Sequence, residues 1–232
     1  MEEKELQVPV RFEATSDLSG QAHCTRTESL LLAAILVAAF HAIPYWLFRF
    51  FPARELYERL GANVYGTLYD AVSGVMPFML CFGVPIRSGL TLGQWRGKEL
   101  RVVGICVLPI ILTALVYPLT SRPFSGQRIG SWLVSPAAQD LLFAGYLYGL
   151  FDVTFPAIVH KKCRVRVAVI LTACFFALWH VPNFRSMPVS YVSFQLFYTF
   201  VGCVWMLLTR QLTGSIVPGL MTHMACNFIA WL

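Results

Sequence analysis

The chain has 232 residues, of which 57% are hydrophobic and only 13% are charged, and its net charge is +6. A soluble domain of this length would carry about a quarter charged residues and no long apolar runs, so the composition excludes an ordinary soluble protein. The positive charge does not indicate a nucleic-acid partner, because Lys and Arg lie in short loops between apolar segments. The segments are continuously apolar rather than alternating, which disfavours a β-barrel. We therefore predict an all-α, polytopic membrane helix bundle.

The chain begins with a polar segment of mixed charge, residues 1–28. Its acidic start and the long apolar run that follows argue against a signal peptide, which starts with positive charge and has a shorter apolar region. We predict that residues 1–28 form a tail on one face of the membrane. The remaining residues, 29–232, form the predicted transmembrane helical domain.

Seven apolar stretches follow the tail, and each approaches the ~20 residues that a helix needs to cross a bilayer. We predict transmembrane helices over 29–50, 64–84, 102–119, 132–155, 167–185, 191–209 and 215–232. Lys and Arg are more frequent in the loops on one side of this arrangement, and the positive-inside rule then puts the N-terminus in the cytoplasm and the C-terminus outside. We expect an integral, multi-pass protein of the plasma membrane of a prokaryote.

Two polar residues, Gln139 and Asp140, stand side by side in the fourth apolar stretch. Polar and ionisable groups are expensive in lipid, and they usually face the interior of a helix bundle or a cavity. A simpler interpretation is a helix-packing face, because Gly145 and Gly149 form a stripe of small residues that lets another helix approach closely. The depth of Asp140 within the stretch favours the first interpretation.

Histidines in the fifth and seventh stretches form a second set of polar residues. His180 lies near the end of the fifth stretch, and His223 and Asn227 are four residues apart in the seventh, which puts them on one face of a helix. Interhelical hydrogen bonds are the simpler explanation for each of them alone. The predicted topology, however, brings these residues and Asp140 to one depth in the outer half of the bilayer. We therefore expect them to converge on one cavity.

Three short motifs occur in order along residues 132–232. QDLLFAGYLYG comes first, FALWH follows as Phe176 to His180, and HMACN is last as His223 to Asn227. This part of the chain resembles the CAAX prenyl protease and bacteriocin-processing family of intramembrane proteases, also called the CPBP or Abi family. The family pattern is Glu-Glu-x-x-x-Arg, then Phe-x-x-x-His, then His-x-x-x-Asn. The resemblance identifies residues 132–232 as a protease-like core.

The first motif departs from the family pattern at each of its defining positions. Gln139 stands where the family has its first Glu, Asp140 where it has the second, and Ala144 where it has Arg. A carboxylate can take a proton from water, whereas an amide cannot. Gln139 can therefore hold a water molecule but cannot act as its base, and Asp140 points about 100° away around the helix.

The resemblance implies an intramembrane endopeptidase that cleaves a membrane-anchored, prenylated or sorted protein substrate. Asp140, His180 and His223 would activate water, Gln139 would hold it, and Asn227 would donate to the oxyanion. Two histidines and one carboxylate also suit a divalent metal such as zinc, with His180, His223 and Asp140 as the ligands. The lipid bilayer is the expected environment.

Two other functions stay open at this point. A pseudoprotease would keep the fold and bind a membrane-protein partner without cleaving it, which the altered first motif favours. A small transporter would use Asp70, Asp140 and His223 as a proton or ion path. The sequence leaves the oligomeric state open.

Overall fold

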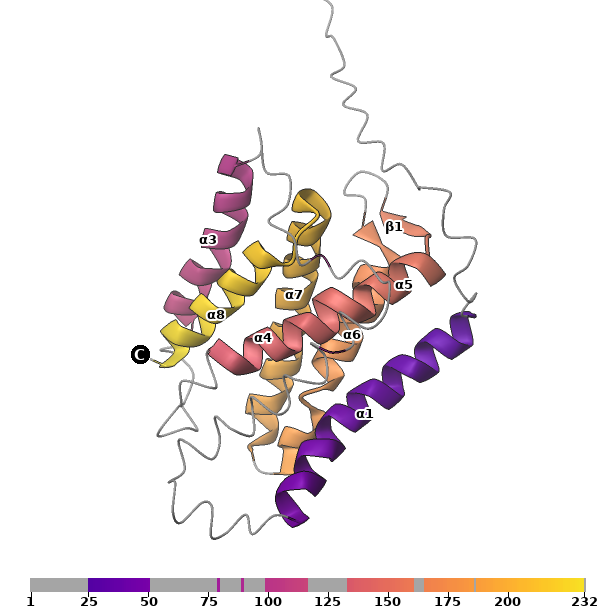
Figure 1. Ribbon diagram of the computed structural model, residues 1–232. Helices are drawn as coiled ribbons and strands as arrows, with labels where there is room; N and C mark the ends of the chain where they lie inside the picture. The colour runs from indigo at the N-terminus through magenta and orange to yellow at the C-terminus, as the bar shows by residue number, and fades with distance from the viewer. Residues whose placement is uncertain are drawn as a thin grey trace, which may run out of the picture.

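The structure is a computed structural model, and it describes residues 25–50, 79, 89, 99–116, 133–160, 165–185 and 187–231 (Figure 1). Residues 1–24 of the predicted tail, nearly all of the predicted helix over 64–84, and Asp70 lie outside these residues. The structure therefore does not test the role of Asp70 in the transporter interpretation. The described part of the chain is almost entirely helical, which confirms the all-α class.

The helices and strands follow one another in chain order as follows. They are α1 (Arg26–Phe50), α3 (Glu99–Val116), α4 (Ser135–Asp140), the π-helical turn η3 (Leu141–Leu147), α5 (Tyr148–Thr154), β1 (Ile158–His160), β2 (Val165–Arg166), α6 (Val167–Leu178), the 3-10 turn η4 (Val181–Arg185), α7 (Val189–Thr213) and α8 (Val217–Trp231). The two strands pair antiparallel and form a short ribbon between α5 and α6.

Two helical stretches in the described residues are long and apolar enough to cross a membrane, Val167–Arg185 and Val189–Thr213. Both correspond to predicted transmembrane helices. A shorter apolar helix covers Arg101–Val116, where another span was predicted. The total of seven spans stays a prediction, since length and composition single out only these two stretches in the part of the chain that the structure describes.

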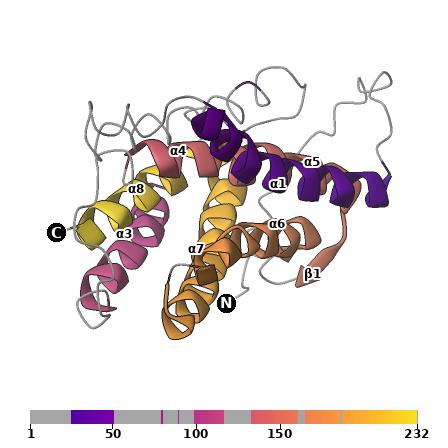
Figure 2. The same cartoon turned by 90° about the horizontal axis from the view of Figure 1, so that it is seen from below.

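The helices pack in two groups that meet at α7. Helices α3 and α8 lie side by side, and α6 packs along α7 (Figure 1). Helices α4 and α5 are joined through η3 into one continuous rod, which lies across α6 and α7 (Figure 2). The rod brings the residues of the first motif against those of the second and third.

The rod is also the centre of the core. Four of the large side chains that are fully buried in the described residues come from it, Leu142, Phe143, Leu147 and Phe151. Phe151 packs against Phe155 and Phe175 with ring centroids 5.9 and 5.7 Å apart. Because a densely packed interior leaves side chains little freedom to move, this core fixes where the polar residues of the rod point.

Helix α1 begins at Arg26, three residues before the predicted start. Glu28 and Thr25 exchange hydrogen bonds, since Thr25 N donates to the Glu28 carboxylate at 2.6 Å and Glu28 N donates to Thr25 Oγ1 at 3.3 Å. This reciprocal arrangement is a capping box, which satisfies amide groups that the first helical turn leaves without intrahelical acceptors. The guanidinium of Arg26 lies over the ring of Phe155, 5.7 Å from its centroid, and places the start of α1 beside the end of the rod.

Candidate active site

The centre of the candidate site is a contact between Asp140 and His223. Asp140 ends α4 and is fully buried, and its Oδ1 lies 2.9 Å from Nδ1 of His223 on α8. The second carboxylate oxygen of Asp140, Oδ2, is also buried and has no hydrogen-bond partner in the part of the chain that the structure describes. A buried carboxylate requires a close partner, because its desolvation is costly. The structure therefore joins the first motif to the third through one polar contact.

Phe176 brings the second motif to the same place. The ring of Phe176 meets the imidazoles of His180 and His223 edge-on, with centroids 5.7 and 6.0 Å away. On its other side it packs against Phe143 of the rod, with centroids 5.0 Å apart and planes at 77°. The two histidines thus flank one aromatic ring, and the three motifs meet around Phe176.

Gln139 and Asn227 stand at the edge of this group. Gln139 donates from Nε2 to Ser135 Oγ at 3.0 Å, so its amide nitrogen is directed along its own helix. Asn227 is half-buried and lies one turn beyond His223 on α8. The acidic residue of the first motif, Asp140, is therefore the one that makes the contact with His223.

An apolar cavity of about 70 Å³ lies between α3, α7 and α8, and His223 forms part of its wall. This volume is enough for a few water molecules, since each needs roughly 10–15 Å³ of such space. Apart from His223, its lining includes Pro109, Phe176, Cys203 and Met206. His223 is thus in contact with Asp140 and also borders a space that can hold a reactant.

The predicted zinc ligands do not assemble into a metal site. Among the residues that the structure describes, no group of three or more His, Cys, Asp or Glu side chains could hold a metal ion. Asp140 and His223 are in contact, and the imidazole of His180 packs edge-on against Phe176, the ring that His223 also meets. In this arrangement Asp140, His180 and His223 do not fit a three-ligand zinc centre.

Sequence reasoning missed Arg210, whose side chain is only 7% exposed. The predicted span ended at 209 and left Arg210 in the following loop, whereas α7 continues to Thr213. Arg210 donates from Nη1 to the backbone carbonyls of Ala144 and Gly145, and its guanidinium lies 4.6 Å from the centroid of the Tyr148 ring. An arginine at the end of an apolar stretch was the available signal, because such residues can be buried when carbonyl groups compensate their charge.

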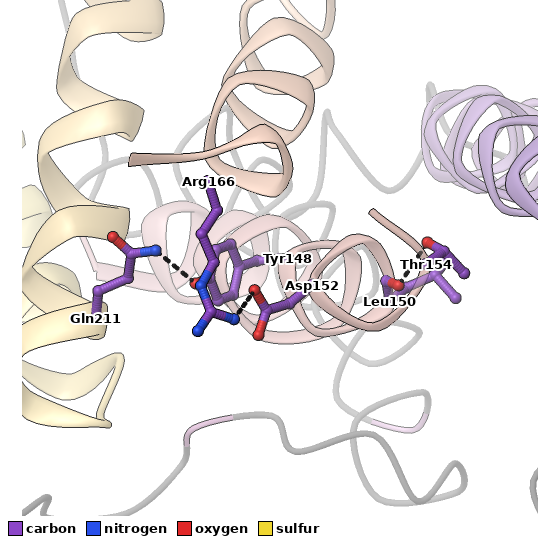
Figure 3. Close-up of polar contacts among 6 residues, drawn as sticks. All are labelled: Tyr148, Leu150, Asp152, Thr154, Arg166 and Gln211. Carbon is purple, nitrogen blue, oxygen red and sulfur yellow. Dashed lines mark hydrogen bonds and ion pairs between the residues drawn. The ribbon is translucent and has the colours of Figure 1, made fainter. Parts of the chain in front are cut away.

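A cluster of polar contacts lies at the α5 end of the rod (Figure 3). Gln211 donates to the hydroxyl of Tyr148 at 3.1 Å, and Arg166 donates to Asp152 at 2.6 Å. Burial of the Arg166 guanidinium lowers its pKa, but the hydrogen bond to Asp152 and the charges of Asp152 and Tyr148 together outweigh that effect and leave the pKa raised. The Asp152–Arg166 pair is partly exposed, unlike Asp140, and it ties the end of the rod to the start of α6.

Comparison with known proteins gives one match. A family model described as type II CAAX prenyl endopeptidase Rce1-like matches residues 121–229. No curated protein and no solved structure matches the chain. The matched range contains all three motifs.

Proposed function

We propose that the chain, which the Rce1-like model of type II CAAX prenyl endopeptidases matches over residues 121–229, is an intramembrane endopeptidase of that family whose general base is His223. The family is one of membrane-embedded proteases that act on membrane-associated proteins. The finer assignment rests on the contact between Asp140 and His223, which is the observation that carries the proposal.

The contact sets the protonation of the imidazole. A buried carboxylate accepts a hydrogen bond, so Nδ1 of His223 carries the proton and Nε2 is left with a lone pair. Nε2 can then take a proton from water while the hydroxide forms a bond to the scissile carbonyl carbon. Asp140 stabilises the imidazolium that results, and the same proton passes to the leaving amine when the peptide bond breaks.

The altered first motif fits this division of roles. Gln139 cannot accept a proton from water, and its amide nitrogen is held by Ser135. With His223 as the base, Asp140 needs only to orient and stabilise the ring, a task for which its shorter side chain is sufficient at 2.9 Å. Asn227 is placed on the same face of α8 as His223, where its amide can donate to the oxyanion.

A peptidase assay in detergent with a C-terminally prenylated peptide tests the proposal. General-base catalysis contributes about 10²–10⁴-fold, so we expect Asp140→Asn and His223→Ala to lower kcat/KM by at least about 10²-fold. Asp152→Asn is the matched control, because Asp152 is a carboxylate of the same rod that pairs with Arg166 outside the site. It should leave kcat/KM within about twofold of the wild-type value. Unchanged cleavage by Asp140→Asn and His223→Ala would overturn the assignment.

The second candidate is a pseudoprotease, which Gln139 and Ala144 favour because they replace an acid and an arginine of the family pattern. The same assay separates the two candidates. A silent wild type together with activity gained in Gln139→Glu would show a decayed site. Cleavage by the wild type that is lost in His223→Ala would show a working one.

A further inference from the structure

The π-helical turn η3 leaves one backbone carbonyl of the rod without its usual donor. In an α-helix the N–H of Tyr148 would bond to the carbonyl of Ala144, four residues earlier. Here it bonds instead to the carbonyls of Phe143 and Gly145, five and three residues earlier, and passes over Ala144. Single π turns inside α-helices contain one surplus residue and are frequent at functional sites.

Arg210 supplies a side-chain donor to the carbonyl that the N–H of Tyr148 passes over. Its Nη1 donates to the carbonyl of Ala144 and, at 3.0 Å, to that of Gly145. One face of its guanidinium is covered by the ring of Tyr148. Gly89 approaches it as well, since a Cβ added to Gly89 would lie 2.9 Å from Arg210 Nε, and the positive φ of 72° there also requires glycine. The guanidinium of Arg210 is therefore enclosed at the π turn by backbone carbonyls, the ring of Tyr148 and Gly89.

The π turn decides which residue of the rod faces His223. The turn contains one residue more than an α-helix would need between Asp140 and Tyr148. With Tyr148 as the fixed point, Asp140 therefore occupies the position that Leu141 would occupy in an uninterrupted α-helix. Successive residues of a helix differ by about 100° around its axis. If the turn relaxed to an α-helix while Tyr148 stayed in place, Leu141 would face His223 and Asp140 would rotate away.

We propose that Arg210 is a positioning residue that holds the π turn and so keeps Asp140 in register with His223. The inference rests on the proposed function for its consequence, because the pair that it positions is the proposed catalytic pair. The alignment of Asp140 with His223 is a property of the fold, so it can be measured whether or not the protein cleaves a substrate.

The measurement is the tautomer of His223, read from nitrogen chemical shifts after labelling histidine with ¹⁵N. His223→Gln identifies the signal. Bonding to Asp140 should fix the proton on Nδ1 in the wild type, whereas a free imidazole favours the other tautomer. We expect Arg210→Met to lose the Nδ1-protonated signature and Arg210→Lys to keep it only in part, because lysine lacks the planar fork. Arg166→Met is the matched control and should keep the signature, since Arg166 pairs with Asp152.

Deletion of Ala144 provides a second test, which distinguishes a change of register in Arg210→Met from misfolding of that variant. Removing the surplus residue converts the turn to an α-helix with Asp140 in its original place, so the deletion combined with Arg210→Met should regain both helical circular dichroism and the Nδ1-protonated signature. Retention of the signature in Arg210→Met would overturn the proposal, as would a folded double variant without it. An inactive wild type with the signature intact would defeat the proposed function and leave this inference standing.

Discussion

Phe176 contacts residues of all three motifs of the candidate site. Its ring is 4% exposed and touches Phe143, His180 and His223. Replacing a buried phenylalanine with alanine leaves a cavity and costs about 3–5 kcal/mol. In this position the cavity would also free the His223 ring to leave Asp140.

We expect Phe176→Ala to lower the melting temperature in detergent by roughly 6–20 °C and to reduce kcat/KM at least about tenfold. The matched control is Phe175→Ala, because Phe175 is the adjacent residue, is partly buried and packs on Phe151 away from the site. Thermal unfolding and the peptidase assay should show a stability loss for both variants and an activity loss for Phe176→Ala alone. Equal activity losses in the two variants would contradict a specific role for Phe176.

At the residue scale, the sequence is informative about which residues share a helix face but not about which helices touch. The four-residue spacing predicts that His223 and Asn227 lie on one side of α8. It does not reveal that Asp140, rather than Gln139, meets His223, because that depends on the rotation of the rod. Arg210 escaped sequence reasoning for the same reason, since its carbonyl partners are more than sixty residues away in the chain.

Among the elements, the start of α1 depends on the ionisation of one side chain. Hydrogen bonding to the backbone N–H of Thr25, together with its hydroxyl, lowers the pKa of Glu28 below the ordinary value of 4.5. A carboxyl whose pKa is depressed by folding contributes stability that is present above the unfolded pKa and is lost as the pH falls through the folded value. The first turn of α1 should therefore open in acid.

Amide hydrogen exchange over the first turn of α1 measures this effect. After correction for intrinsic rates, we expect protection at about pH 6 to exceed protection at about pH 3. Glu28→Gln keeps the size of the side chain but does not titrate, so its protection should be the same at both pH values. A pH dependence that persists in Glu28→Gln would show that another group controls the turn.

The π turn is the element that sequence patterns could least anticipate. Its residues, LLFAGYL, form a continuous apolar run without proline, and apolar periodicity alone predicts an ordinary α-helix there. The deviation involves a donor from α7 and the ring of Tyr148, which are tertiary features. The capping box of α1, in contrast, is local and is legible as Thr25 followed three residues later by Glu28.

For the whole molecule, hydropathy predicted the described helices well and their relation to the bilayer less completely. The stretch Val167–Arg185 has 19 residues, which as a helix would span roughly 28 Å, close to the ~30 Å hydrocarbon core. Helix α7 is longer and can cross with some tilt. The rod lies across both of them, a packing direction that no linear pattern of hydrophobicity records.

The predicted topology makes a specific statement about the two ends of Val167–Arg185. Residue 163 lies in the predicted cytoplasmic loop and residue 187 on the outer side, so this stretch should separate them. In a chain with its other cysteines replaced by serine, Cys163 should react with a membrane-impermeant maleimide only after the cells are permeabilised. Met187→Cys, with Cys163 also replaced, should react in intact cells, because the positive-inside rule keeps the basic loop around residue 163 in the cytoplasm. Labelling of both positions from the same side would mean that the stretch does not cross the bilayer, and the candidate site would then have to be approached from a different face.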